Sequence, residues 1–208
     1  MIRVFITDDH ALVRHGLREI LAETPDIQVV GEAATSDETI QQLEHADWDV
    51  LVLDLSLPGR SGLDVLRAVR KLRPHLPVLI LSMHAEDQFA LHLLRAGANG
   101  FLNKESASAE LVQAIQAVAR GETYLSPAFR GQLQNQPAPS TALHERLNDR
   151  EFELLCRLAA GENLHDMAGR MRLRPTTIAR YKTRLLRKTG MRSIAELIAY
   201  ARQARLQP

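Results

Sequence analysis

The sequence predicts an α/β domain with a parallel sheet, followed by a small all-helical domain. Three observations predict this arrangement: strand-like aliphatic runs alternate with amphipathic stretches five times in the first half, no such alternation follows Gly121, and the charge changes sign between the halves. Residues 1–123 hold 11 Lys and Arg against 18 Asp and Glu, a net charge of −7, whereas residues 124–208 carry +8. This asymmetry favours a nucleic-acid-binding unit joined to an acidic unit with a different task.

Five short runs are expected to form the strands. Most are continuous aliphatic runs rather than alternating ones, which is typical of parallel strands buried on both faces. The predicted strands are Ile2–Ile6, Ile27–Ala33, Val50–Leu53, Val78–Leu81 and Gly100–Leu102. The amphipathic stretches that predict helices lie near His10–Glu23, Asp37–His45, Leu63–Arg73, Asp87–Ala96 and Ala109–Arg120. Strands and helices in this order predict a doubly wound, flavodoxin-like sheet of five strands.

The second half predicts a linker and four helices. Residues 131–142 are rich in Gln, Pro and small polar residues, as linkers commonly are. Two helix starts carry capping-box patterns, Asn148 with Glu151 and Ser193 with Glu196. The predicted helices are Asn148–Ala160, Asp166–Met171, Thr176–Thr189 and Ser193–Arg205. We therefore expect a first domain over residues 1–123, a linker over 124–144 and a second domain over 145–208.

Composition excludes several classes of protein. The apolar runs are far shorter than the roughly 18 residues of a membrane span, and Asp8 and Asp9 interrupt the amino-terminal apolar stretch before it can form a signal peptide. A single cysteine, Cys156, rules out an internal disulfide and a cysteine-based zinc site. None of the eight histidines pairs with another at ligand spacing, which favours surface or packing roles. His84 is of separate interest because it lies two residues after Ser82. We expect a cytoplasmic protein without a membrane partner.

Acidic, hydroxyl and basic side chains follow the predicted strands. Asp8 and Asp9 end the first strand, Asp54 the third and Ser82 the fourth, while the fifth continues into Lys104. Because parallel strands end at one edge of a sheet, these groups should converge. Three converging carboxylates repel one another, and a divalent cation with oxygen ligands, Mg²⁺ rather than zinc, resolves that conflict. Asp54 can then act as a nucleophile that forms an acyl phosphate, and Lys104 suits a phosphoryl oxygen.

The same residues carry a resemblance to a known family. Residues 1–123 resemble a response-regulator receiver domain in four features: Asp8-Asp9, the segment Asp54-Leu-Ser-Leu-Pro-Gly59, Ser82, and the segment Phe101-Leu-Asn-Lys104. One position departs from the pattern, since Glu105 stands where many receivers carry proline. A cis peptide bond is therefore not expected there.

The resemblance implies a role for each matching residue. Asp54 is expected to accept the phosphoryl group. Mg²⁺ is expected to be held by Asp9, Asp54 and the backbone carbonyl of Ser56, with Asp8 acting through water. Ser82 and Phe101 match positions that rearrange when the phosphoryl group arrives, and Lys104 matches the lysine that contacts it.

The predicted helix Thr176–Thr189 has two different faces. Ile178, Tyr181 and Leu185 share the apolar face through their helical spacing. The opposite face carries Arg180, Thr183, Arg184 and Arg187. Flanking cations that can contact phosphates are Arg172, Arg174, Lys182, Lys188 and Arg192. With the short helix and turn before it, this spacing predicts a helix-turn-helix whose second helix reads the major groove.

A second resemblance covers the chain from about Leu147 onward. It is similar to the LuxR-type helix-turn-helix of NarL/FixJ-class regulators. The matching segments are Leu147-Asn-Asp-Arg-Glu151, Leu158-Ala-Ala-Gly-Glu162, Thr177-Ile178, Leu185-Leu-Arg-Lys188 and Ser193-Ile-Ala-Glu-Leu197. The residues expected to contact DNA are Thr176, Thr177, Arg180, Thr183, Arg184, Arg187 and Lys188. Ala179 and Tyr181 stand where the family usually has lysine and histidine, and Arg174 stands where a serine often caps the helix.

Together the two resemblances imply a two-component transcriptional regulator rather than an enzyme. A sensor histidine kinase is expected to phosphorylate Asp54, and the active form is expected to bind double-stranded DNA as a homodimer and to act on RNA polymerase. We weigh two alternatives. A free-standing Mg²⁺ phosphohydrolase would need a general acid beside Asp54, which the sequence does not offer. An RNA-binding antiterminator would stack bases on exposed aromatic side chains, of which the second half has few.

Overall fold

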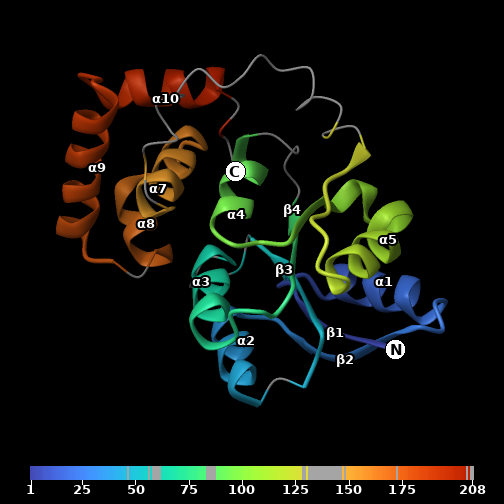
Figure 1. Cartoon of the computed structure of the whole chain (residues 1–208). Coiled ribbons are helices and arrows are strands. Elements are labelled where there is room, and N and C mark those ends of the chain that lie inside the picture. Colours follow the sequence, from blue (N-terminus) through green and yellow to red (C-terminus); the bar gives the residue numbers. More distant parts are fainter. Residues whose placement is uncertain are drawn as a thin grey trace. The chain divides into compact units, whose positions relative to one another are not determined.

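The structure, a computed structural model, describes residues 1–45, 47–55, 57, 62–82, 88–127, 130, 147, 149–171, 173–204 and 206. The chain divides into two compact units, a sheet unit in the first part and a helical unit in the last part (Figure 1). The predicted linker, residues 131–142, lies outside the described residues. Among the helices of the described ranges, none combines the length and the apolar character needed to cross a membrane.

The sheet unit is built on five parallel strands in the order β2-β1-β3-β4-β5. These strands are β1 (Ile2–Thr7), β2 (Ile27–Ala33), β3 (Val50–Asp54), β4 (Val78–Ser82) and β5 (Gly100–Asn103). Each predicted strand is confirmed to within one residue at either end. Thr7 pairs with Leu53 in the β1–β3 register, so the residues that follow them, Asp8 and Asp54, are neighbours at the carboxyl edge.

Helices cover both faces of this sheet, as doubly wound domains require. On one face α1 contacts α5, and on the other α2 contacts α3 (Figure 1). The helices are α1 (Ala11–Ala22), α2 (Ser36–Gln42), α3 (Gly62–Leu72), α4 (Gln88–Arg95) and α5 (Ala107–Ala119), with short 3₁₀ helices η1 (Leu43–His45) and η2 (Lys104–Ser106). Residues Val50–Leu53 of the central strand are fully buried, which explains why their sequence is uninterrupted by polar residues.

Tyr124 belongs to the sheet unit, although the sequence analysis places it at the start of the linker. Its side chain is buried, and its backbone carbonyl accepts a hydrogen bond from the Phe101 N–H at 3.0 Å. Its hydroxyl donates to Glu110 of α5 at 2.6 Å. Tyr124 forms an isolated parallel β-bridge with Gly100 of the edge strand β5. A single bridging residue has no alternating pattern that a prediction from sequence could detect. The described residues 124–127 all belong to this compact unit, beyond the predicted boundary at residue 123.

The helical unit contains the four predicted helices. They are α7 (Asp149–Ala159), α8 (Leu164–Arg170), α9 (Pro175–Thr189) and α10 (Ile194–Gln203), each within two residues of its predicted ends. α7 contacts α9 and α10, and α8 contacts α9. The shared core includes Phe152, Leu155, Ile178, Leu185 and Leu197, all fully buried. The order and packing of α8 and α9 agree with the predicted helix-turn-helix.

Local sequence determines where α9 and α10 begin and end. Pro175 occupies the first turn of α9, and Gly190 ends the helix with a φ of 72° that favours glycine. At Ser193 half of the predicted capping box is present: the Ser193 hydroxyl accepts the Glu196 N–H at 3.2 Å, while the Glu196 carboxylate accepts the N–H of Arg192 at 2.9 Å. The other predicted box starts at Asn148, which lies outside the described residues.

Candidate functional site

Four side chains gather at the carboxyl ends of β1 and β3. Ligand atoms of Asp8, Asp9, His10 and Asp54 all lie within 4.8 Å of one another. The side chains of Asp8 and Asp54 are 0% and 1% exposed, whereas that of Asp9 is 30% exposed. The cluster is therefore deep at the two strand ends and open at Asp9, which allows a small solute to approach.

Lys104 joins the two buried carboxylates. Its Nζ lies 2.6 Å from Asp8 Oδ2 and 2.9 Å from Asp54 Oδ2. Burial alone would lower the pKa of Lys104, but the hydrogen bonds and charges of these two carboxylates outweigh burial, and the pKa is raised above its ordinary value. Lys104 is therefore a cation at neutral pH, as a contact with a phosphoryl oxygen requires.

The turn after β5 places Lys104 in this position. The Asn103 side chain caps η2 by accepting the Glu105 N–H at 2.8 Å. A proline at position 105, common in the receiver family, has no N–H with which to make this bond. No cis peptide bond occurs in the described ranges of the chain. Glu105, which stands in place of the common proline, thus donates a backbone hydrogen bond that proline could not make.

The charges of the cluster suit a divalent cation. Three carboxylates face one ammonium, which leaves an excess of about two negative charges when His10 is neutral. Carboxylate oxygens at this separation are ligands that Mg²⁺ accepts. The donor set therefore fits the predicted cation, with Asp9 nearest to solvent. The predicted carbonyl ligand, Ser56, lies outside the described residues.

His10 is a member of this cluster that the sequence analysis missed. Its Nδ1 lies 2.7 Å from Asp9 Oδ1 and 3.4 Å from Asp8 Oδ1. Because no second histidine lies at ligand spacing from it in the sequence, His10 is expected to have a surface or packing role. Its place directly after two predicted cation ligands is the signal that could have found it.

Gly62 is a second residue that the sequence analysis missed, and it supports Asp54. A Cβ at this first residue of α3 would lie 2.5 Å from the Asp54 carbonyl oxygen and 2.7 Å from Leu55 Cα. The Gly62 N–H also donates to the Leu55 carbonyl at 3.1 Å. α3 can therefore begin against the end of β3 only because position 62 has no side chain.

The remaining predicted residues of this site lie on neighbouring strands. Ser82 ends β4, one residue beyond Leu81, the register partner of Asp54, and its side chain is buried. Phe101 is fully buried in β5. Ser82 is thus on the strand next to β3, and Phe101 is one strand further away, on the strand that leads into Lys104. Their movement on phosphorylation remains a prediction.

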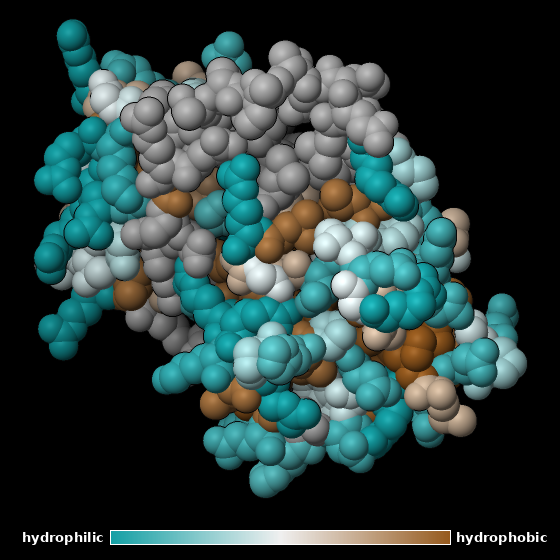
Figure 2. Space-filling model, in the orientation of Figure 1, coloured by the Kyte–Doolittle hydropathy of each residue, from teal (hydrophilic) through white to brown (hydrophobic). Residues whose placement is uncertain are grey.

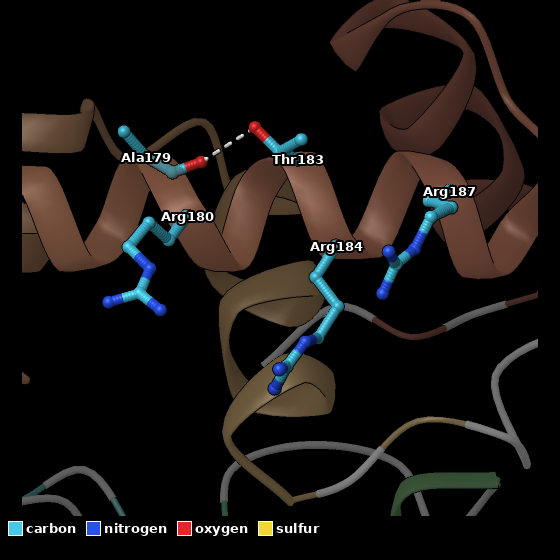
Figure 3. Close-up of a pocket in the computed structure, with 5 residues that line it drawn as sticks. All are labelled: Ala179, Arg180, Thr183, Arg184 and Arg187. Atoms are coloured by element: carbon cyan, nitrogen blue, oxygen red, sulfur yellow. Dashed lines mark hydrogen bonds between the residues drawn. The ribbon is translucent and has the colours of Figure 1, made fainter.

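α9 presents a polar face opposite its buried one. Arg180, Thr183 and Arg187 are exposed, whereas Ile178 and Leu185 are fully buried. Arg180, Arg184 and Arg187 line one shallow depression of about 380 Å³, and the Thr183 hydroxyl donates to the Ala179 carbonyl at 3.1 Å. Figure 3 shows these side chains along the helix. Figure 2 shows mostly hydrophilic side chains over the part of the helical unit that carries α9. In the first turn of α9, Thr176 is exposed and Thr177 is half-buried.

Arg184 and Lys188 lie on the flank of α9 that faces α7. The Lys188 Nζ is 2.6 Å from Oε2 of Glu151, and the Arg184 Nε is 3.8 Å from Oε1 of the same carboxylate. Glu151 is fully buried near the start of α7. Both cations are expected from the sequence to contact DNA. Lys188 also has an ion-pair partner within the helical unit. Its contact with a DNA phosphate remains a prediction.

Comparison with known proteins identifies two matching families. The response regulator receiver domain matches residues 4–116, and the luxR family of bacterial regulatory proteins matches residues 145–201. The chain is 33% identical over 204 residues to the response regulator GacA of Pseudomonas viridiflava, covering 97% of this chain and 95% of GacA.

Two solved structures of RcsB are similar to the chain over nearly its whole length. RcsB of Salmonella enterica serovar Typhimurium bound to promoter rprA with the phosphomimetic BeF3- is 26% identical with a TM-score of 0.71, covering 96% of this chain and 98% of RcsB. A structure of two RcsB dimers bound to two parallel DNAs is 26% identical with a TM-score of 0.62, covering 97% and 98%.

Proposed function

Since this chain belongs to the response regulators that join a receiver domain to a LuxR-type DNA-binding domain, we propose that its acidic cluster accepts a phosphoryl group from a sensor histidine kinase. The observation that carries the proposal is the bridge of Lys104 between two buried carboxylates, at 2.6 and 2.9 Å. A buried ion pair is a costly arrangement for stability alone. A lysine beside the acceptor oxygen instead suits an incoming phosphoryl group.

Asp54 is the nucleophile of the proposed transfer. An Asp54 carboxylate oxygen forms a bond to phosphorus while the nitrogen–phosphorus bond of the kinase phosphohistidine breaks, and the released imidazole nitrogen takes up a proton. The product is an acyl phosphate on Asp54. Lys104 then contacts a phosphoryl oxygen, and Ser82 and Phe101 rearrange around the new group.

Mg²⁺ is the proposed cofactor of this site. Asp9, Asp54 and the Ser56 carbonyl would hold the ion, with Asp8 acting through water. When bound, it neutralises negative charge at the phosphoryl oxygens. Asp9 provides the solvent-facing ligand, since it is the most exposed carboxylate of the three.

The proposed output is sequence-specific binding of double-stranded DNA by α9. Its outward residues Thr176, Arg180, Thr183 and Arg187 are suited to base edges, and Thr177, Arg184 and Lys188 to phosphates. The similarity to RcsB supports a homodimer on DNA. Such a dimer acts in the cytoplasm by contacting RNA polymerase at promoters. The proposed domains are the receiver over residues 1–123, the linker over 124–144, whose first residue Tyr124 packs in the core of the sheet unit, and the DNA-binding domain over 145–208.

Phosphorylation of a single carboxylate tests the proposal. After incubation with acetyl phosphate and Mg²⁺, intact-mass measurement should show one added phosphoryl group on the wild type and none on Asp54→Asn. Asp26→Asn removes an exposed carboxylate of the same unit and should behave as the wild type. Equal phosphorylation of Asp54→Asn and the wild type would refute the assignment. In the same preparation, phosphorylation should strengthen binding to duplex DNA more than to RNA.

A further inference from the structure

We propose that His10 is a direct ligand of the cation at the acidic cluster, and that it makes this site bind divalent ions that accept nitrogen, Mn²⁺ among them, more tightly than Mg²⁺. The inference rests on the proposed cation site and adds the identity of a ligand and the class of ion. It starts from one juxtaposition: the imidazole Nδ1 stands among three carboxylates, 2.7 Å from Asp9 Oδ1.

The separations are close to those of ligands around one ion. An octahedral ion with ligands at about 2.1 Å places neighbouring ligand atoms about 3 Å apart and opposite ones about 4.2 Å apart. His10 Nδ1 is 2.7 and 3.4 Å from oxygens of Asp9 and Asp8, and the whole set lies within 4.8 Å. A cation can therefore be reached by all four residues with only small side-chain movements.

The backbone holds His10 at this position independently of its imidazole. His10 precedes the first turn of α1, and its backbone N–H donates to Asp8 Oδ1 at 2.9 Å. Its side chain makes no capping hydrogen bond and is 64% exposed. Among the described residues, Asp8 and Asp9 are the only partners of the imidazole. Substitution of His10 should therefore leave the fold intact.

The chemistry of the donor set decides the class of ion. Mg²⁺ prefers oxygen ligands and retains its waters, whereas imidazole is a good ligand for first-row transition ions. Mn²⁺ binds the same carboxylates as Mg²⁺ and also accepts a neutral imidazole. Lys104 contacts Oδ2 of Asp8 and of Asp54, whereas the imidazole lies beside Oδ1 of Asp8 and of Asp9, so the two groups use different carboxylate oxygens. Coordination by Nδ1 requires the proton to be on Nε2, which the exposure of the ring permits.

Mn²⁺ binding followed by electron paramagnetic resonance tests the proposal in the full chain. Titration gives the Mn²⁺ affinity, competition gives the Mg²⁺ affinity, and pulsed measurements detect nitrogen coupled to the bound ion. His10→Ala should weaken Mn²⁺ binding by about tenfold or more, change Mg²⁺ binding by less than about twofold, and abolish the nitrogen coupling. His15→Ala removes an exposed imidazole from the same helix and should leave all three measurements unchanged.

The outcomes separate this inference from the cation site on which it rests. If the wild type binds neither ion, or if Asp9→Ala leaves both affinities unchanged, the cation site itself is refuted. If the wild type binds Mn²⁺ without nitrogen coupling, or if His10→Ala lowers both affinities equally, the site stands and His10 only orients Asp9. Either of the last two results overturns the proposal. Thermal unfolding with a chelator checks that His10→Ala is as stable as the wild type.

Discussion

The carboxylate of Glu151 lies 2.6 Å from the ammonium of Lys188, and this pair joins α7 to α9 across 37 residues of sequence. Glu151 is fully buried, whereas Lys188 is partly exposed at the edge of the helix. The apolar contacts of Ile178 and Leu185 hold α9 against the unit but have little directionality. The ion pair therefore adds a directional contact between α7 and one flank of α9 to the apolar packing that sets the inner face of the helix.

Loss of Lys188 should destabilise the helical unit. Lys188→Met removes the ammonium from a buried carboxylate, and we expect the free energy of unfolding to fall by about 2–3 kcal/mol. Differential scanning calorimetry of the full chain can follow the two units. Arg187→Ala, an exposed change one residue earlier, should have little effect. The double variant Glu151→Leu with Lys188→Met should recover part of the loss, and no recovery would show that the pair is not the cause.

A methyl group at Gly62 should disturb Asp54. The close approach of a Cβ to the Asp54 carbonyl, 2.5 Å, forces the end of β3 to move. Gly62→Ala should lower stability by about 1–3 kcal/mol and slow phosphorylation by acetyl phosphate. Unfolding can be followed by the fluorescence of Trp48, the single tryptophan.

Gly16→Ala provides the matched control for the Gly62 variant. Position 16 lies inside α1, and a Cβ there meets no atom within 4 Å. Because alanine favours helix, this change should raise stability by about 0.5–1 kcal/mol without altering phosphorylation. If both glycine variants phosphorylated at the wild-type rate, the support of Asp54 by Gly62 would be disproved.

The contribution of Lys104 to stability should depend on pH in one direction. Its carboxylate partners raise the pKa of Lys104 in the folded state above the ordinary 10.5, so folding favours the protonated form. The stabilisation is therefore fully present below pH 10.5 and is lost as the pH rises through the raised pKa. The difference in unfolding free energy between wild type and Lys104→Met, measured by urea titration, should be constant near neutral pH and shrink in strong alkali. If the difference in unfolding free energy between the wild type and Lys104→Met grew with pH, Lys104 would not be stabilising the fold as a cation.

Arg180 should carry sequence specificity. It is exposed near the start of α9, the part that enters the major groove. The test uses a DNA duplex selected from a random pool. Arg180→Ala should weaken binding to this duplex by about 1–3 kcal/mol through one base pair, and should reduce the difference in affinity between selected and random DNA. Arg202→Ala removes an exposed arginine from α10 and should leave this difference unchanged. An equal loss of affinity for both duplexes by Arg180→Ala would reduce Arg180 to a phosphate contact.

The sequence determined the elements of the fold and the main acidic site because both follow from local patterns. Uninterrupted aliphatic runs such as Val50–Leu53 indicate buried parallel strands, and parallel strands end at a common edge. Asp8, Asp54 and Lys104 could therefore be brought together from their positions at strand ends. In the same way, the spacing of Ile178 and Leu185 determined the inner face of α9, and Arg180 fell on the outer face.

Only the tertiary structure decided which partners these side chains find. Lys188 and Arg180 are both cations on the same helix in the sequence. In the structure Lys188 faces the buried carboxylate of Glu151 on another helix, whereas Arg180 faces solvent. Tyr124 joins the core, Gly62 touches the backbone of Asp54, and His10 turns its imidazole toward Asp9. Each of these relationships depends on distances of a few ångströms between separate elements. Periodicity identifies the face on which a residue lies, whereas packing determines the atom that it meets.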